Sequence, residues 1–117
     1  MNPATIKQLT ELAIRFRDER DWRQFHNFKD MALSMSLEVA ELCELMQWKN
    51  GAELQNHLTA NRQRVGEELS DVLFWVLAIA NDLNIDIDDA FRRKLEENAK
   101  KYPVEKSRGK STKYSDL

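Results

Sequence analysis

Four acidic residues form two matched pairs, and both pairs lie within stretches that are otherwise apolar. The first pair is Glu38-x-x-Glu41 in MALSMSLEVAELCELMQW, and the second is Glu68-x-x-Asp71 in VGEELSDVLFWVLAIA. A spacing of three residues places both members of a pair on one face of a helix. Four carboxylates that converge inside a helical bundle cannot all remain ionised unless a cation joins them. Such oxygen ligands suit Mg²⁺ or Mn²⁺, so the pattern favours metal-assisted phosphate chemistry.

Helical wheels place the two pairs in the same way. The apolar arc of the first segment contains Met31, Met35, Leu42 and Leu45. The apolar arc of the second segment contains Val65, Leu69, Val72, Val76 and Ile79. Glu38 and Glu68 fall inside these arcs, whereas Glu41 and Asp71 lie at their edges. Either pair alone is compatible with ordinary surface charges, but two pairs that both intrude on an apolar arc favour a metal site.

A di-iron bundle is the competing metal site. It requires Glu-x-x-His on two helices, and neither His26 nor His57 follows a glutamate by three positions. A ligand set made of carboxylate oxygens without imidazole therefore favours Mg²⁺.

Length and composition are typical of one globular domain, and we expect residues 1–117 to form it. The formal net charge is −2, so no overall positive field attracts nucleic acid. Cys43 is the only cysteine, which excludes an intrachain disulfide, and we expect it to be a small core residue. No apolar run approaches the roughly 20 residues that span a membrane, and the N-terminus lacks a signal-peptide pattern. A cytoplasmic protein is the expectation.

Helical periodicity dominates the chain, and no segment alternates as a strand does. We expect helices over about 3–19, about 30–48, about 52–58, about 62–83 and about 86–100. Asn2 is the expected cap of the first helix and Asp86 that of the last. Asn50 and Gly51 are expected to stop the second helix. The segment RDWRQFHNF is predicted to be an aromatic loop whose Phe25 and Phe28 belong to the core, and residues 103–117 form a basic tail without periodicity.

The acid motif has a wider resemblance. Glu38-Val-Ala-Glu41, a spacer of 26 residues and Glu68-Leu-Ser-Asp71 resemble the ExxE and ExxD signature of the MazG-like, all-α nucleoside triphosphate pyrophosphohydrolases. The segments FRDERDWRQFH, EVAELCELMQWK, EELSDVLFWV and KYPVEKSRGKSTKYSDL resemble the dCTP pyrophosphatase branch of that family. Two positions depart from the pattern of animal members, which tend to have Tyr in place of Trp75 and His near Ala13.

The resemblance implies a fold and a reaction. The fold is a four-helix core assembled as a homotetramer, a dimer of dimers. The reaction is Mg²⁺-dependent hydrolysis of a deoxynucleoside triphosphate, with dCTP or a modified dCTP favoured, to the monophosphate and pyrophosphate. Such an enzyme would cleanse the nucleotide pool.

The resemblance also assigns residues. Glu38, Glu41, Glu68 and Asp71 would bind the metal and carry catalysis. Phosphate contacts would come from Lys94, Asn98, Lys101 and Tyr102, and Trp22, His26 and Trp48 would lie near the base or sugar. The basic tail, with Arg108, would order against a neighbouring subunit or close over phosphate.

The aromatic residues also have a physical interpretation. Trp22 in a loop and Trp48 at a helix end occupy places where a flat ring can meet a ligand. Trp75 lies one turn beyond Asp71, where it either walls the metal site or packs in the core or an interface.

Two further functions remain open at this point. One is a pyrophosphohydrolase for another nucleotide, such as a phosphoribosyl nucleotide, because the same acid motif serves that chemistry. The other is a non-catalytic helical interaction module, which would show no stabilisation by Mg²⁺ with nucleotide.

Overall fold

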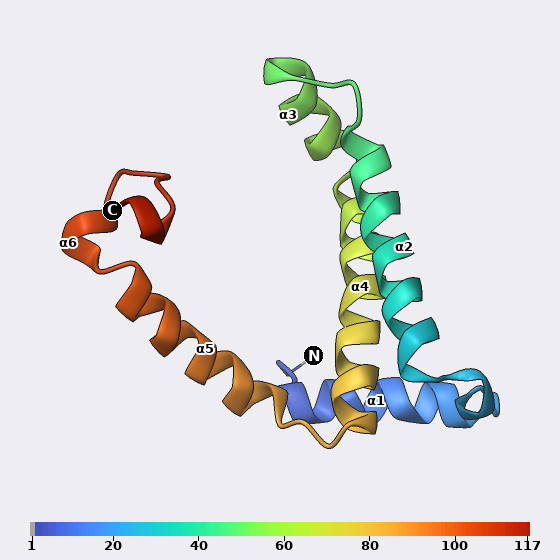
Figure 1. The fold of residues 1–117 in the computed structure, drawn as a ribbon. Coiled ribbons are helices and arrows are strands. Elements are labelled where there is room, and N and C mark those ends of the chain that lie inside the picture. Colours follow the sequence, from blue (N-terminus) through green and yellow to red (C-terminus); the bar gives the residue numbers. More distant parts are fainter. Residues whose placement is uncertain (1) are drawn as a thin grey trace. The chain divides into compact units, whose positions relative to one another are not determined.

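The computed structural model describes residues 2–117, and all regular structure in this range is helical, which confirms the all-α prediction. The α-helices are α1 (Ile6–Asp18), α2 (Phe28–Met46), α3 (Gly51–Ala60), α4 (Arg62–Asp82), α5 (Ile87–Lys101) and α6 (Val104–Ser107) (Figure 1). Two short 3-10 helices are η1 (Arg23–Phe25) and η2 (Tyr114–Asp116). The chain divides into two compact units: the first extends to Asn84 and the second comprises Ile85–Leu117.

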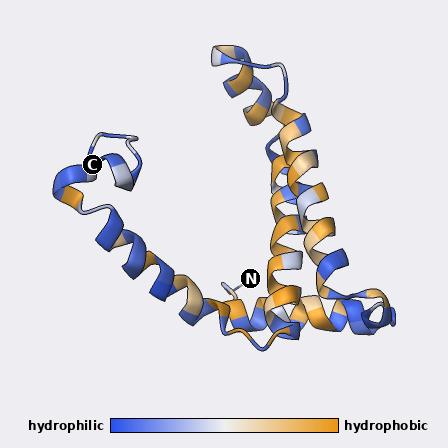
Figure 2. Cartoon of the chain, in the orientation of Figure 1, coloured by the Kyte–Doolittle hydropathy of each residue, from blue (hydrophilic) through white to orange (hydrophobic). Residues whose placement is uncertain are grey.

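The first unit is built on the antiparallel pair α2 and α4, which lie side by side along their lengths (Figure 1). Helix α1 also packs against α4. Apolar residues recur along both long helices (Figure 2). The buried apolar residues are Ala13, Met31, Leu45, Leu77, Ala78 and Ala80. The first unit therefore has a narrow core, concentrated where the C-terminal half of α4 meets α1 and α2.

Helix α1 begins later than predicted. Thr5 is its cap: the Gln8 N–H donates to Thr5 Oγ1 at 3.1 Å, and the Thr5 N–H donates to Gln8 Oε1 at 2.8 Å. This reciprocal capping box satisfies two backbone donors at once, which Asn2 before a proline cannot do. The prediction of a cap at Asn2 is therefore wrong.

Helix α2 has a clear start and an abrupt end. Asn27 caps it, accepting from the Asp30 N–H at 2.9 Å, and Asp30 lies in the first turn. The helix ends at Met46, and Trp48 has a left-handed φ of 71°. Gly51, predicted to stop α2, instead opens α3 with a φ of 54°.

Three predicted core residues are exposed. Cys43 is exposed, and the exposed fractions of Phe25 and Phe28 are 66% and 57%. The buried stripe of α2 contains Met31 and Leu45, and a residue two positions before Leu45 projects from nearly the opposite side of the helix. Phe25 and Phe28 lie at the bend between η1 and α2, which places them outside that stripe.

The second unit contains α5, α6 and η2. Asp86 caps α5 as predicted, accepting from the Asp89 N–H at 3.0 Å. Helix α5 is largely hydrophilic (Figure 2). The tail returns toward the end of α5: the Tyr114 ring lies edge-on to Tyr102 at 5.8 Å, and Lys101 Nζ lies 4.9 Å from the Tyr114 ring centroid. The segment without periodicity thus has a defined local fold.

Within residues 2–117, no helix combines the length and the apolarity that crossing a bilayer requires.

Candidate functional site

Three of the four predicted acids converge between α2 and α4. Glu38 and Glu41 come from α2 and Glu68 from α4, and one carboxylate oxygen of each lies within 4.8 Å of the others. Glu38 and Glu68 are half-buried, whereas Glu41 is exposed. The packing of α2 against α4 brings these oxygens together, because Glu38 and Glu68 lie within the apolar arcs of the two helices and Glu41 lies at the edge of one.

Burial and mutual repulsion shape the electrostatics of this acid cluster. Burial raises the pKa of Glu38, and the negative charges of Glu41 and Asp71 raise it further. Burial also raises the pKa of Glu68, with additional contributions from its hydrogen bonding and repulsion with Glu41. Both carboxyl groups therefore hold a proton more readily than an ordinary glutamate, as expected where several carboxyl groups converge in a partly buried place.

Asp71 is not part of the tight cluster, although it lies close by. Its side chain is exposed, yet its charge contributes to the raised pKa of both Glu38 and Glu68. Asp71 follows Glu68 by one turn on the same face of α4. The structure thus brings three acids into ligand distance and leaves the fourth within electrostatic reach.

The donor chemistry of the acid cluster fits a hard divalent cation. Glu38 Oε2 and Glu68 Oε2 are buried and have no hydrogen-bond partner among residues 2–117, which is costly for a carboxylate unless something else satisfies it. No histidine or cysteine belongs to the cluster among residues 2–117. Three carboxylates without nitrogen or sulfur ligands match the preference of Mg²⁺ and Mn²⁺ and lack the imidazole of a di-iron site.

His26 and Trp75 form an aromatic wall in the same unit. Their ring centroids are 5.1 Å apart, and Trp75 lies one turn beyond Asp71 on α4. Burial and the positive charge of Arg17 lower the pKa of His26, while Asp82 opposes this shift. These effects together favour the neutral imidazole, and its buried Nδ1 has no partner within residues 2–117. An unpaired polar atom beside a flat ring is suited to a heterocyclic ligand.

The other two tryptophans lie at the surface. Trp22 is 42% exposed, and its ring is edge-on to Phe16 at 5.7 Å. Trp48 is 87% exposed in the turn between α2 and α3. An exposed indole in the left-handed backbone region stores strain without packing in compensation.

The predicted phosphate-binding residues belong to the second unit. Lys94 Nζ lies 3.7 Å from Glu97 Oε2, and Asn98 lies one turn further along α5, where its carbonyl accepts from the Tyr102 N–H at 2.8 Å. Lys101 and Tyr102 contact Tyr114, and Arg108 is exposed after α6. Lys94, Asn98 and Lys101 lie on α5, Tyr102 caps its end and Arg108 follows α6. Their role toward a ligand remains a prediction.

Sequence reasoning missed a charged network at the end of α1. Arg17 is buried and donates to Asp82 through Nη1 at 2.8 Å and through Nη2 at 3.1 Å. Arg23 of η1 also bonds Asp82. Two signals were present: Arg17 extends the stripe of Ala13 by one turn, and Asp82 follows Trp75 by one heptad.

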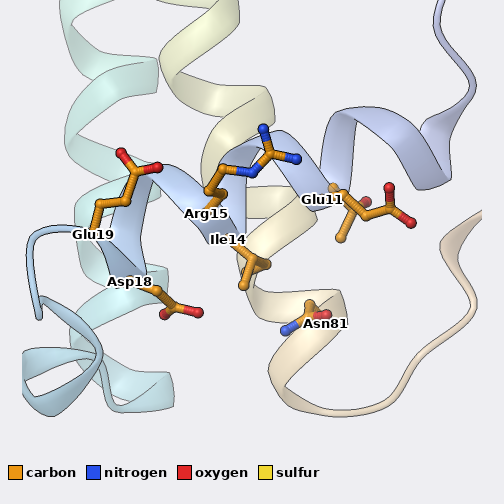
Figure 3. Close-up of a pocket in the computed structure, with 7 residues that line it drawn as sticks. Glu11, Ile14, Arg15, Asp18, Glu19 and Asn81 are labelled. Carbon is orange, nitrogen blue, oxygen red and sulfur yellow. The ribbon is translucent and has the colours of Figure 1, made fainter.

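A separate hollow of about 390 Å³ lies beside α1 and the last turn of α4, and Figure 3 shows its lining. Its lining residues are Thr10, Glu11, Ile14, Arg15, Asp18, Glu19 and Asn81. None of the predicted site residues is among them. The acid cluster, with its unpartnered oxygens, is the better candidate for chemistry.

Comparisons with known proteins give matches that cover most of the chain. The model of the MazG-like family matches residues 33–117, a range that contains both acidic pairs. The chain is 40% identical to rat dCTP pyrophosphatase 1 over 115 residues, which cover 97% of this chain and 68% of the rat protein. The human dCTP pyrophosphatase 1 is 37% identical over 115 residues, with the same coverage.

The fold has a close counterpart among solved structures. A pyrophosphatase from Archaeoglobus fulgidus superposes with a TM-score of 0.79 at 35% identity, covering 88% of this chain and 96% of the archaeal chain. Similarity of sequence and of structure thus extends over nearly the whole chain, and the protein belongs to the MazG-like family.

Proposed function

We propose that this protein hydrolyses dCTP, or a closely related deoxynucleoside triphosphate, to the monophosphate and pyrophosphate. The observation that carries the proposal is the acid cluster, in which two buried carboxylate oxygens lack partners in the described part of the chain. The names of the rat and human relatives support dCTP as the substrate. A cytoplasmic location, where a nucleotide pool would be cleansed, belongs to the same proposal.

Glu38, Glu41, Glu68 and Asp71 would hold the metal ion, with Mg²⁺ favoured and Mn²⁺ as the alternative. A bound Mg²⁺ would neutralise charge on the phosphates and lower the pKa of a water molecule. A carboxylate oxygen of Glu38 or Glu41 that is not engaged with metal accepts a proton from the attacking water. The water oxygen bonds to the α-phosphorus, the bond to the bridging oxygen breaks, and pyrophosphate leaves with the bonding electrons.

The nucleoside end of the substrate would lie against the aromatic residues. Trp75 and His26 offer a flat wall and a ring nitrogen that no other described residue bonds, and Trp22 and Trp48 offer exposed indoles. Stacking on such rings contributes roughly 1–3 kcal/mol per base and tolerates different bases. Lys94, Asn98, Lys101, Tyr102 and Arg108 would contact the phosphates.

We also propose that copies of the chain associate as a homotetramer with a four-helix core in each protomer. Several leucines of the first unit are exposed, among them Leu33 at 57%, Leu37 at 58% and Leu69 at 52%. Apolar surface of this kind on long helices is typical of subunit interfaces. Sedimentation equilibrium measures the assembly directly, and a monomer at micromolar concentration would contradict it.

The reaction is tested by incubating the purified protein with dCTP in water enriched in ¹⁸O, with and without Mg²⁺. We expect dCMP that carries the label and pyrophosphate that does not, because attack at the α-phosphorus places the new oxygen on the monophosphate. The Glu38→Gln and Asp71→Asn variants should lose turnover, whereas Glu44→Gln, on the same helix as Glu38, should not. Label in pyrophosphate, or full activity without divalent metal, would contradict the mechanism.

A panel of substrates separates this activity from its nearest alternative. The panel contains the four deoxynucleoside triphosphates, 5-modified dCTP and a phosphoribosyl nucleotide, each assayed for pyrophosphate release. A higher kcat/KM for the phosphoribosyl nucleotide than for dCTP would assign the site to that substrate instead.

A further inference from the structure

Asp82 lies in line with the candidate site along one helix. Glu68, Trp75 and Asp82 follow one another on α4 at intervals of seven residues. Seven residues make nearly two turns, so the side chains drift by only about 20° per interval and rise about 10.5 Å. One helix therefore presents a metal-binding acid, an aromatic wall and Asp82 along a single face.

Asp82 joins two arginines from different segments. Arg17 at the end of α1 is 2% exposed and binds both carboxylate oxygens, at 2.8 and 3.1 Å. Arg23 of η1, whose side chain is 55% exposed, bonds the same carboxylate from the solvent side. The side chain of Asp82 is only 12% exposed between them. Bidentate binding in a water-poor setting gives this junction a defined geometry.

The backbones of the two arginines also bond residues of the aromatic segment 22–26. The Trp22 N–H donates to the carbonyl of Arg17 at 3.2 Å, and the His26 N–H donates to the carbonyl of Arg23 at 3.0 Å. His26 then contacts Trp75 with its ring. Each arginine thus holds Asp82 with its side chain and one residue of the aromatic segment with its backbone.

We propose that Asp82 is a positioning residue for the nucleoside end of the pocket. Through Arg17 and Arg23 it anchors the segment 22–26 to α4, which holds His26 against Trp75. Since α4 also carries Glu68 of the acid cluster, this anchor sets the separation between the base-binding wall and the metal-binding acids. The inference rests on the proposed function, because it assigns the wall to a nucleotide.

Arg23→Gln is the variant that tests the anchor. Arg23 is half exposed, so its removal leaves the buried pair of Arg17 and Asp82 in place and the fold intact. Arg15→Gln on the exposed side of α1 is the matched control, since it removes the same charge without touching Asp82. Arg23→Lys keeps the charge and should recover part of the effect. Asp82→Asn provides a second, stronger variant.

We expect Arg23→Gln to raise the KM for dCTP about five-fold while kcat stays within about two-fold, as a loss of uniform binding requires. Cross-relaxation between the His26 and Trp75 ring protons should weaken, and exchange of the His26 amide should accelerate. Arg15→Gln should match the wild type in each measurement. A role in stability alone predicts a lower melting temperature with unchanged KM and unchanged ring contact, and that result would overturn the proposal.

The two proposals fail in different ways. A wild-type protein that turns over no nucleotide contradicts the proposed function, and with it the assignment of the wall to a nucleoside. The ring contact and the amide exchange need no substrate, so they still decide whether Arg23 anchors the segment. A wild-type ring contact in both Arg23→Gln and Asp82→Asn refutes the anchor even if dCTP is the substrate.

Discussion

Replacing Glu38 by glutamine is expected to change stability in opposite directions with and without metal. Glu38 lies between α2 and α4 with like charges nearby, and burial, Glu41 and Asp71 all raise its pKa. Glutamine has nearly the same shape and carries no charge. Without metal, Glu38→Gln removes repulsion and the cost of a partly buried charge, so the free energy of unfolding should rise. With Mg²⁺, the same change removes a ligand.

The geometry sets the magnitude. Two unit charges 4.8 Å apart, the limiting separation in the acid cluster, repel by about 0.9 kcal/mol in water and by about 3.5 kcal/mol at an effective dielectric constant of 20. Glu41 is exposed, so screening keeps the gain near the lower value, about 1 kcal/mol. For a domain of this size, that raises the melting temperature by about 4 °C. Mg²⁺ at a hundred times its Kd stabilises the wild type by about 2.7 kcal/mol.

Thermal unfolding in EDTA and in a series of Mg²⁺ concentrations provides the assay, with Glu44→Gln as the control. At pH 7 the curves of wild type and Glu38→Gln should cross as Mg²⁺ increases. The difference in stability between the two proteins in EDTA depends on pH. Because the folded-state pKa of Glu38 is raised, its carboxyl group does not oppose folding below the unfolded pKa of glutamate, about 4.3, and this stability is lost as pH rises through the folded pKa. The two proteins should therefore converge near pH 4. A variant that is less stable than wild type in EDTA, or that keeps the full Mg²⁺ shift, would refute the reasoning.

Three further predictions concern the structure around the site. Asp82→Asn should lower the free energy of unfolding in urea by about 3 kcal/mol, because it leaves the 2%-exposed Arg17 without its anion. Burial alone would raise the pKa of Asp82, but its bonds with Arg17 and Asn81 and the charges of Arg17 and Arg23 lower it overall. The greater stability of the wild type should therefore persist at pH 5 and fade as pH drops below the ordinary pKa of aspartate. A stability difference that grows on acidification would contradict this. Trp48→Gly should gain about 1 kcal/mol of stability, because glycine adopts the left-handed φ of 71° without strain. The same variant should raise the KM for dCTP roughly ten-fold through lost stacking. A loss of stability would show that the indole is packed. Thr5→Ala should cost about 1 kcal/mol in the same urea titration through loss of the capping box, whereas an unchanged midpoint would show that α1 does not depend on it.

Periodicity and local chemistry determined much of this protein before any tertiary contact was known. The four long helices, the Asp86 cap and the placement of Glu38 and Glu68 on apolar arcs follow from residues within a turn or two of one another. Such features depend on backbone hydrogen bonds and on side-chain spacing along a single helix, which a linear pattern records. Thr5 and Gln8 carry an equally local signal in the form Thr-x-x-Gln, although Asn2 followed by Pro3 also fits the start of a helix.

Tertiary structure alone decided which of these side chains meet. The convergence of Glu41 with Glu68, the exposure of Phe25, Phe28 and Cys43, and the contact of His26 with Trp75 depend on how α2, α4 and the bend at η1 pack. The bond between Arg17 and Asp82 spans 65 residues, a separation over which no periodic pattern carries information. Burial and pairing are properties of the space between helices, and that space exists only once the chain has folded.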